Sequence, residues 1–333
     1  MGKVTIKDIA NKANVSKTTV SMVLNNKPNN ISETTKNKIF EIAKELEYVP
    51  NSLARGLSTK KSYTIGVLVP DIQNPFFSEM IKIVENILEK KGYSIIICNS
   101  YSSKNRERDN IRLLLSKIVD GVIIAPVDDS DENFSILEKN KVPFIIVDRI
   151  LEDHEKYNSI FCDNKLGIDI GMDYLYSKGK RNIGFVSGSK DIAVANIRLQ
   201  SYIEKSKQLQ IYNSDFYIQD EFTMEGGFNA TKKLLERNKK IDSIFYSSDI
   251  MAIGGIKYLL RNGYKIPEDI SILGFDNINI CSFIEPELTT IAQPIREISI
   301  EAANMIIGLI EEEILKKSSK IKKPFLVERA TVK

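Results

Sequence analysis

Polar and aromatic side chains gather where several apolar, strand-like runs of this chain end. Carboxylates and guanidinium groups form paired hydrogen bonds, and aromatic rings stack on the apolar faces of sugars. In open parallel sheets, ligands bind beyond the carboxyl ends of the strands. The pattern therefore predicts a site for a small polyol, most simply a monosaccharide. Its residues are Asp71, Asn74, Phe76, Phe77, Asp148, Arg149, Arg198, Ser248, Asp276, Asn277 and Gln293.

Capping of the following helix is the alternative role for an acidic or amide residue after a strand. We expect this structural role for Asp163 and Asp249. We expect ligand contact instead for the combination of Asp148, Arg149, Arg198 and Asp276.

Common catalytic motifs are missing from the sequence. It has no G-x-G-x-x-G, P-loop, H-E-x-x-H or G-x-S-x-G motif. Its single histidine, His154, lies in a polar stretch typical of a solvated loop. Cys98, Cys162 and Cys281 are widely spaced and mostly lie in strand-like runs, which indicates reduced core thiols. We therefore expect no enzyme activity, no metal site and no cofactor.

Apolar runs of strand length alternate with amphipathic runs of helix length from Thr64 onward. This alternation predicts α/β architecture, with two doubly wound parallel sheets covered by helices on both faces and a break near 160–163. We expect residues 311–323, which change from acidic to basic, to form a solvated helix end. The predicted strands are 64–69, 94–98, 121–125, 144–147, 183–186, 243–246 and 271–274, with 288–293 and 325–329 as further candidates.

The first part of the chain has the pattern of two short helices joined by a tight turn. Thr5 and Asp8 match a capping box, Asn14 suits a left-handed turn residue, and Ser16 suits the N-cap of the second helix. A helix-turn-helix with a polar face fits the major groove of DNA. The spacing on the second helix places Val20, Val23 and Leu24 inward and Lys17, Thr18 and Ser21 outward.

A third helix and a linker follow. Ser32 is the expected N-cap of a helix that runs to Tyr48, and Pro50 stops it. The next residues suit one or two helical turns, which are marginal alone because they are short and contain Gly56. The expected domains are a head at 1–49, a hinge helix at 50–61 and a core at 62–333, the core divided into an N-subdomain at about 62–161 plus 292–325 and a C-subdomain at about 162–291.

Charge is spread unevenly along the chain. Residues 1–61 contain 11 basic and 5 acidic residues, a net charge of +6, whereas the remainder contains 36 and 39, a net charge of −3. A basic head of this size can release counterions from several DNA phosphates. The start lacks the apolar stretch of a signal peptide, and no apolar run is long enough to span a bilayer. We therefore expect a cytoplasmic protein with DNA as a partner and no membrane contact.

The whole chain resembles a transcriptional regulator of the lactose-repressor (LacI/GalR) family. The head resembles that family's T-I-x-D-V-A-x-x-A-G-V-S-x-x-T-V-S-R-V-L-N, and 50–57 resembles its P-N-x-x-A-R-x-L. Core segments such as 65–77, 248–254 and 288–294 match as well. The resemblance implies a helix-turn-helix head with a hinge helix, followed by a two-lobed core of the type I periplasmic-binding-protein fold. The residues implied to contact DNA are Thr5, Ser16, Lys17, Thr18, Thr19, Ser21, Met22, Asn25, Asn29, Leu53, Ala54, Arg55 and Leu57, the last as a minor-groove wedge.

The predicted ligand site resembles that of ribose-binding proteins and ribose repressors, which implies Phe222 as a stacking aromatic. Three residues depart from the family's pattern. Met22 replaces an arginine that reads bases, Ser248 replaces an asparagine of the sugar site, and Ser201 replaces a glycine.

The resemblance implies a repressor that binds a pseudo-palindromic operator as a homodimer and leaves it when a small sugar binds. A ribose-like pentose is the first candidate for this effector. A regulator co-repressed by a sugar or a purine is the alternative. A solute-binding protein of a transport system fits less well, because it would need a signal peptide and no helix-turn-helix.

Overall fold

A computed structural model of the chain describes residues 4–25, 30–48, 61–127, 131–149, 156–312 and 317–333. Two compact units divide the chain, Met1–Ser62 and Tyr63–Lys333. Several sequence predictions lie outside the described residues, namely the hinge helix, Asn29, Leu53, Ala54, Arg55, Leu57 and the loop with His154.

The described residues of the first unit form three helices around a small apolar core, α1 (Ile6–Ala13), α2 (Lys17–Leu24) and α3 (Glu33–Glu45). The Asp8 carboxylate accepts hydrogen bonds from the backbone N–H and the hydroxyl of Thr5, at 2.8 and 2.7 Å. Ser16 Oγ accepts the Thr19 N–H at 3.0 Å. Both predicted helix starts are therefore confirmed. The core comprises Ile9, Ala10, Ala13, Val20, Val23, Ile39, Ile42 and Ala43.

Left-handed residues end two of these helices. Asn14 has a φ of 58°, as the sequence predicts for the turn between α1 and α2. The prediction that α3 runs to Tyr48 is wrong, because Glu47 turns left-handed with a φ of 49°. The Tyr48 N–H then donates to the Ala43 carbonyl at 2.9 Å, which closes the helix end.

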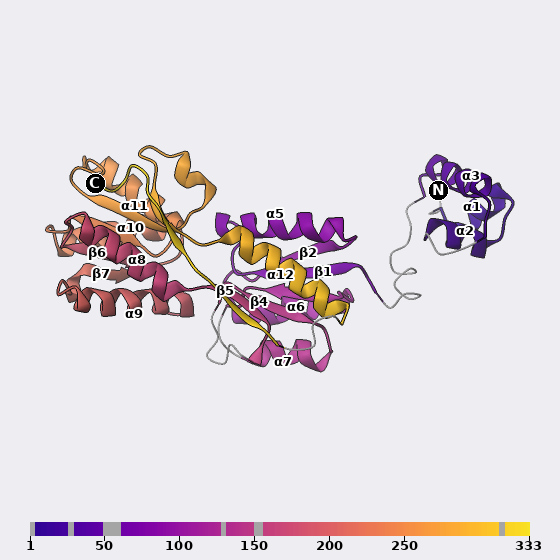
Figure 1. Ribbon diagram of the computed structural model, residues 1–333, viewed down its shortest axis with the longest axis horizontal. Helices are drawn as coiled ribbons and strands as arrows, with labels where there is room; N and C mark the ends of the chain where they lie inside the picture. Colours follow the sequence, from indigo (N-terminus) through magenta and orange to yellow (C-terminus); the bar gives the residue numbers. More distant parts are fainter. Residues whose placement is uncertain (1–3, 26–29, 49–60, 128–130, 150–155, 313–316) are drawn as a thin grey trace. The chain divides into compact units, whose positions relative to one another are not determined.

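The second unit has two lobes, and the first, the N-lobe, contains a six-stranded parallel sheet in the order β11-β5-β4-β3-β1-β2. Helices α5 and α12 pack together on one face, and α6 and α7 cover the other (Figure 1). The strands are β1 (Thr64–Val69), β2 (Ser94–Asn99), β3 (Gly121–Ile124), β4 (Phe144–Val147), β5 (Ser159–Cys162) and β11 (Ser319–Lys322). The helices are α5 (Pro75–Lys90), α6 (Lys104–Ser116), α7 (Asp131–Lys139) and α12 (Ile295–Ile310).

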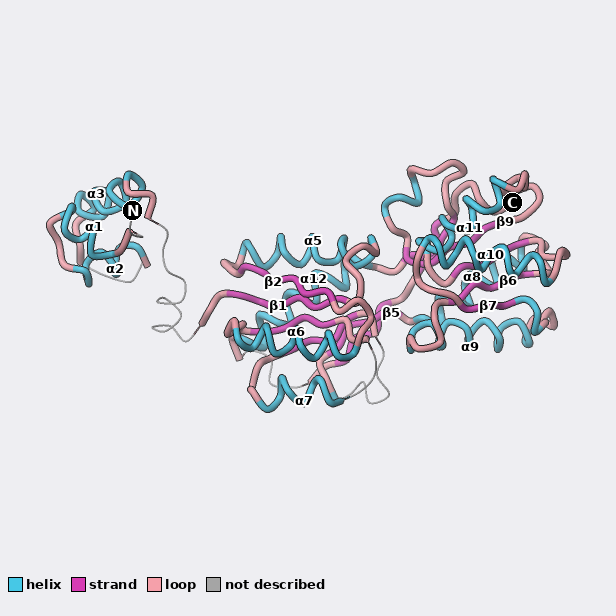
Figure 2. The backbone as a smooth tube through the Cα atoms, turned by 180° about the vertical axis from the view of Figure 1, so that it is seen from behind, coloured by secondary structure: helices cyan, strands magenta, loops and turns pink. Residues whose placement is uncertain are grey.

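The second lobe, the C-lobe, contains a sheet in the order β12-β10-β9-β8-β6-β7, in which only β12 runs antiparallel to its neighbour. Helices α8 and α9 cover one face and α10 and α11 the other (Figure 2). The strands are β6 (Ile183–Ser187), β7 (Tyr217–Gln219), β8 (Ser243–Tyr246), β9 (Ser271–Asp276), β10 (Thr289–Ala292) and β12 (Phe325–Val327). The helices are α8 (Asn164–Ser177), α9 (Ala193–Gln208), α10 (Met224–Arg237) and α11 (Asp249–Arg261), with short turns η2 (Ser214–Phe216) and η3 (Asn279–Ser282).

The prediction of a helix end at 311–323 is wrong. Helix α12 ends at Ile310, and Ser319–Lys322 forms the edge strand β11 beside β5. Lys320 and Lys322 on this strand both pair with Glu301 of α12, which attaches the strand to the helix. The basic residues of this segment thus form ion pairs within the N-lobe.

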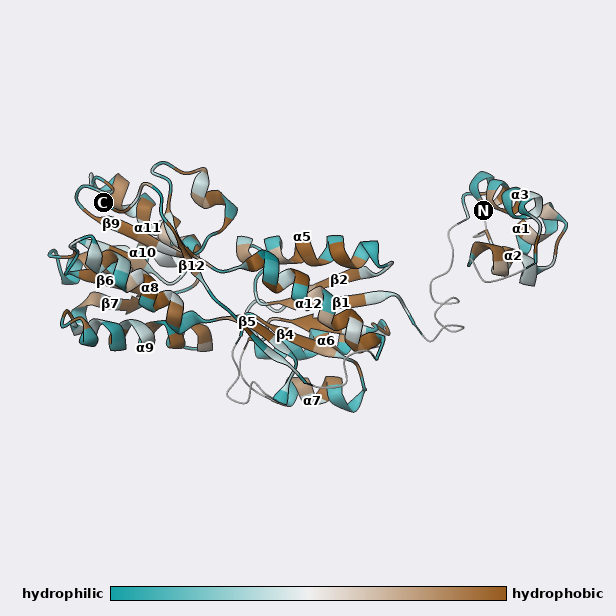
Figure 3. Ribbon diagram, viewed as in Figure 1, coloured by the Kyte–Doolittle hydropathy of each residue, from teal (hydrophilic) through white to brown (hydrophobic). Residues whose placement is uncertain are grey.

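The chain passes between the lobes three times within the described residues, after β5, after β10 and after β11. Apolar residues fill the strands of both lobes, while the outward helix faces are polar (Figure 3). Cys98, Cys162 and Cys281 are buried free thiols, as predicted. Among the described residues, no helix is both long and apolar enough to cross a bilayer.

Substitution of Asn14 tests the turn of the head. Asn14→Val should destabilise the head by about 1–2 kcal/mol, because a β-branched residue resists the left-handed region. Asn14→Gly is the control and should be close to neutral. Hydrogen exchange of the α1 and α2 amides in the full chain measures both effects. Equal protection in the valine and glycine variants would contradict this account of the turn.

Candidate DNA-binding and effector sites

Helix α2 turns an accessible face to solvent. Lys17 and Thr18 are exposed and Ser21 is half-buried. Met22 is 38% exposed and lies outside the apolar core of the head, which Val20 and Val23 fill. Lys17, Thr18, Ser21 and Met22 border one hollow together with Ile6 of α1. The structure therefore brings the predicted base-reading residues of α2 together on one surface.

Other residues predicted to contact DNA form hydrogen bonds within the head. The hydroxyls of Ser16 and Thr19 lie 2.8 Å apart. The Asn25 amide donates to the Ser21 carbonyl at 2.8 Å, so it covers the end of α2. The Thr5 hydroxyl donates to Asp8. These side chains hold the shape of the head, and their contact with DNA stays a prediction.

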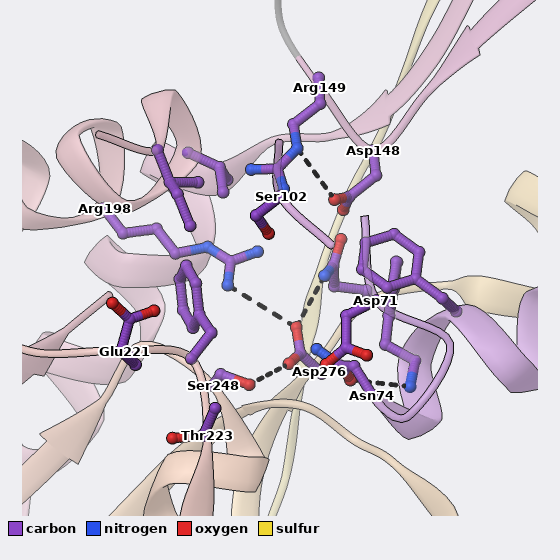
Figure 4. A pocket seen from close by; sticks show the side chains of 16 residues that line it. Asp71, Asn74, Ser102, Asp148, Arg149, Arg198, Glu221, Thr223, Ser248 and Asp276 are labelled. Carbon is purple, nitrogen blue, oxygen red and sulfur yellow. Dashed lines mark hydrogen bonds and ion pairs between the residues drawn. The ribbon is translucent and has the colours of Figure 1, made fainter. Parts of the chain in front are cut away.

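A cavity of about 100 Å3 lies between the two lobes (Figure 4). One buried water needs roughly 10–15 Å3, so the cavity has room for several water-sized groups, which suits a small ligand. Ten residues predicted to contact the effector line it, from both lobes. They are Asn74, Phe76, Phe77, Asp148, Arg149, Arg198, Phe222, Ser248, Asp276 and Gln293.

Arg198 is the most firmly held side chain of the cavity. Its Nε donates to Asn164 Oδ1 at 2.7 Å, and its Nη1 donates to the Ser247 carbonyl at 2.6 Å. The guanidinium also lies 3.9 Å from the centre of the Phe275 ring. These partners hold the buried guanidinium in one position. Truncation of Arg198 would therefore disturb folding as well as ligand binding.

Asp276 ends β9 and points toward Arg198 (Figure 4). Its Oδ1 lies 3.7 Å from Arg198 Nη1 and accepts a hydrogen bond from Gln293 Nε2 at 2.8 Å, and its Oδ2 accepts the Ser248 hydroxyl at 2.9 Å. Burial raises the pKa of Asp276 to about 6, although Arg198, Gln293 and Ser248 favour the ionised form. Gln293 Oε1 is buried and has no hydrogen-bond partner among the described residues.

Asp148 and Arg149 follow β4 in the N-lobe. The Arg149 N–H donates to the Val147 carbonyl at 2.8 Å, which forms a γ-turn around Asp148 with a φ of 65°. Asp276 on the other lobe also has a positive φ, 118°. Such conformations cost about 1–3 kcal/mol and are found where a side chain must be aimed at a site. Burial raises the pKa of Asp148, which lies 3.7 Å from Arg149 Nε.

The N-terminus of α5 supplies Asn74, Phe76 and Phe77. Asn74 Oδ1 accepts the Phe76 N–H at 3.1 Å, so Asn74 caps the helix with one side-chain atom and keeps its amide group for other contacts. The rings of Phe76 and Phe77 meet edge to face with centroids 5.1 Å apart. Phe222 lines the cavity from the C-lobe, where Gly188 makes room for it. A Cβ at residue 188 would lie 2.2 Å from the ring.

Five further residues line the cavity and were not predicted from the sequence, whereas Asn277, which was predicted, does not line it. Glu221 and Thr223 flank Phe222, Ser102 follows β2, and Ile192 and Val194 lie at the start of α9. The signal for Ser102, Glu221 and Thr223 was present, because these polar residues also follow strands. Strand β7, which precedes Glu221, has only three residues, so the sequence pattern did not predict it as a strand.

The capping roles expected for two aspartates differ in outcome. Asp163 caps α8 by accepting the Leu166 N–H at 3.0 Å, as predicted. The capping prediction for Asp249 is wrong, because its carboxylate turns away from its own helix. Its Oδ1 accepts the Thr290 hydroxyl at 2.6 Å, and its Oδ2 accepts the Ile278 N–H at 3.0 Å and the Cys281 thiol at 3.1 Å. Burial, with Asp276 nearby, raises the pKa of Asp249 to about 7.

A helix-turn-helix head and a two-lobed core with a polar cavity define a ligand-regulated DNA-binding protein. Residues 5–51 match the model of bacterial regulatory proteins of the lacI family, and residues 172–332 match the periplasmic-binding-protein-like domain. The HTH-type transcriptional repressor CytR of Escherichia coli (strain K12) is 33% identical, over 99% of this chain and 96% of CytR. The chain therefore belongs to the lacI family of bacterial regulatory proteins and is a DNA-binding transcription regulator, not an enzyme.

Solved structures agree with this assignment. The lac repressor dimer bound to operator and the anti-inducer ONPF is 25% identical with a TM-score of 0.87, over 99% of both chains. A LacI family transcriptional regulator from Enterococcus faecium with bound ribose is 31% identical with a TM-score of 0.72, over 81% of this chain and 98% of that chain. The helical head and the two-lobed α/β core predicted from the sequence are thereby confirmed.

The raised pKa of Asp276 predicts how stability depends on pH. A carboxyl whose pKa is raised by folding stabilises the fold fully below its unfolded pKa, and this contribution is lost as the pH rises through the folded pKa. For Asp276 the window runs from its ordinary value of 3.8 to about 6. The melting temperature of the wild type minus that of Asp276→Asn should therefore be larger below this window than above it, by scanning calorimetry. An equal difference at both ends would contradict the prediction.

Proposed function

We propose that this chain is a cytoplasmic repressor that leaves its operator when a small, uncharged sugar binds between the lobes of its core. The observation that carries the proposal is the set of hydrogen-bonding groups in the cavity. Arg198 and Asp276 are buried and fixed by their partners, and the buried Gln293 Oε1 has no partner among the described residues. A sugar hydroxyl can donate to this amide oxygen and accept from a guanidinium.

The charges of the cavity favour an uncharged ligand. Two guanidinium groups, Arg149 and Arg198, are outnumbered by the four carboxyl groups of Asp71, Asp148, Glu221 and Asp276. A phosphate ester would add two negative charges near these carboxylates, which opposes its binding. The aromatic rings of Phe76, Phe77 and Phe222 supply apolar surface for a sugar ring.

A ribose-like pentose is the first candidate for the effector. The cavity has room for a small ligand, and the related regulator from Enterococcus faecium was solved with ribose. Ser248 is hydrogen-bonded to Asp276, so its short side chain supports a carboxylate that we propose contacts the sugar. The other predicted contacts are Asn74, Phe76, Phe77, Asp148, Arg149, Arg198, Phe222 and Gln293.

On DNA, we propose that a homodimer places two heads in successive major grooves of a pseudo-palindromic operator. Lys17, Thr18 and Met22 on the exposed face of α2 would read bases, and Leu57 of the predicted hinge would enter the minor groove. The sugar lowers the affinity for the operator if it prefers the lobe arrangement that releases the heads. The opposite preference would make the same molecule a co-repressed regulator.

Two measurements test the function together. A thermal-shift screen with ribose, ribose 5-phosphate, hexoses and purines should show the largest stabilisation with ribose and none with its phosphate. A mobility-shift assay on promoter DNA should show a protein–DNA complex that dissociates when ribose is added. Tight binding of a purine without sugar binding would replace the sugar hypothesis, and a complex that forms only with effector would show co-repression.

Phe222→Ala should separate effector binding from operator binding. Loss of the stacking ring should weaken sugar binding by about tenfold, because aromatic contacts contribute roughly 0.5–1.5 kcal/mol beyond the area they bury. Operator affinity without sugar should stay unchanged, since Phe222 lies in the core. Phe325→Ala on β12 is the matched control, because this ring is 53% exposed and does not line the cavity. Calorimetric titration measures both variants, and wild-type affinity in Phe222→Ala would contradict the assignment.

Met22→Arg should change the base preference of the head. A methionine offers an apolar, polarizable tip that can touch a thymine methyl group, whereas an arginine can grip guanine O6 and N7 for about 1–3 kcal/mol. The variant should therefore shift one position of each half-site toward guanine. Selection from a randomised DNA pool with both proteins is the measurement. Identical preferences at every position would show that this side chain does not read bases.

A further inference from the structure

Two segments of the core, one from each lobe, meet beside the cavity. Glu79 lies on α5, three residues after the cavity residue Phe76 and two after Phe77. Its Oε1 accepts the backbone N–H of Asn279, the first residue of η3, at 2.9 Å. Helix α5 belongs to the N-lobe and η3 to the C-lobe, so this hydrogen bond joins the lobes directly.

The segment that holds Asn279 begins inside the cavity. It starts at Asp276, which is fixed by Ser248 and Gln293, and continues through Asn277, whose φ is 58°. The Asn277 side chain accepts a hydrogen bond from Arg329 Nη2 at 2.7 Å. These contacts fix the start of the segment. They therefore restrict how far the Asn279 N–H can move relative to the Asp276 carboxylate.

Asp249 fixes the same segment through hydrogen bonds to its buried carboxylate. Its buried carboxylate accepts the Ile278 N–H and the Cys281 thiol, one residue before and two residues after Asn279. Asp249 also follows Ser248, which lines the cavity. Residues 276–281 thus form a short, braced connection from the effector site to the carboxylate of Glu79.

We propose that Glu79 is a positioning residue that stabilises the observed arrangement of the lobes and thereby sets the affinity for the effector. The proposal rests on the assignment of the cavity as the effector site. A ligand held by Phe76 and Phe77 on one side and by Asp276 on the other requires α5 and the 276–281 segment to stay together. Glu79 joins these two elements without touching the ligand, because it does not line the cavity. The competent fraction of the protein, and with it the apparent affinity, rises when this hydrogen bond forms.

Three variants test the role of Glu79 in the full chain. Glu79→Ala removes the acceptor, Glu79→Gln keeps an oxygen acceptor without the charge, and Glu85→Ala removes an exposed carboxylate elsewhere on α5 as a matched control. Calorimetric titration with ribose should show affinity weakened by roughly threefold to tenfold in Glu79→Ala. Glu79→Gln should recover most of the loss, and Glu85→Ala should match the wild type.

Small-angle X-ray scattering without effector is the second readout, and it does not depend on the identity of the ligand. Glu79→Ala should scatter as a more open core than the wild type, while Glu79→Gln should resemble the wild type. If the wild type does not bind ribose, the proposed effector is wrong, and the scattering comparison still decides the role of Glu79. Scattering curves that are the same in the wild type and Glu79→Ala overturn the proposal, and so does equal ribose affinity in these two proteins.

Discussion

The burial of the Arg198 guanidinium is the constraint on which the proposed effector site depends. A charge removed from water requires donors and acceptors in fixed places, and the chain supplies them from three directions. Asn164 comes from the start of α8, the Ser247 carbonyl follows β8, and the Phe275 ring lies on β9. Because these elements meet at the Arg198 guanidinium, the contacts of this one side chain constrain how they approach each other. Asp276 follows Phe275 and is thereby aimed at the same guanidinium.

The parallel sheets explain why polar residues from distant parts of the sequence meet at one place. The carboxyl ends of the parallel strands in each lobe point toward the cavity. A residue that follows such a strand therefore lies at or near the cavity. The regular part of this arrangement could be predicted from the sequence. Apolar runs predicted β1, β4 and β8 with their observed bounds, and the residues after the runs proved to line the cavity.

The parts that escaped prediction depend on contacts between residues far apart in the chain. Strand β11 has the sequence of a solvated helix end, and it is a strand because β5 offers it an edge and Glu301 neutralises its lysines. Asp249 has the position of a helix cap, and its real partners, Thr290 and the 278–281 segment, come much later in the sequence. The spacing of residues along the sequence does not predict such contacts, because the partners come together only in the completed fold.

The backbone of the cavity is shaped by contacts within the chain. Asp148 and Asp276 hold positive φ values on opposite lobes, and hydrogen bonds from neighbouring residues support these conformations. A site whose groups are ordered by folding loses less conformational entropy when a ligand binds. For the proposed effector, regulation then depends on its differential affinity for the lobe arrangements that the protein can adopt. The three crossings that the described residues make between the lobes suit such a mechanism, because a hinge motion of the lobes would leave each sheet intact.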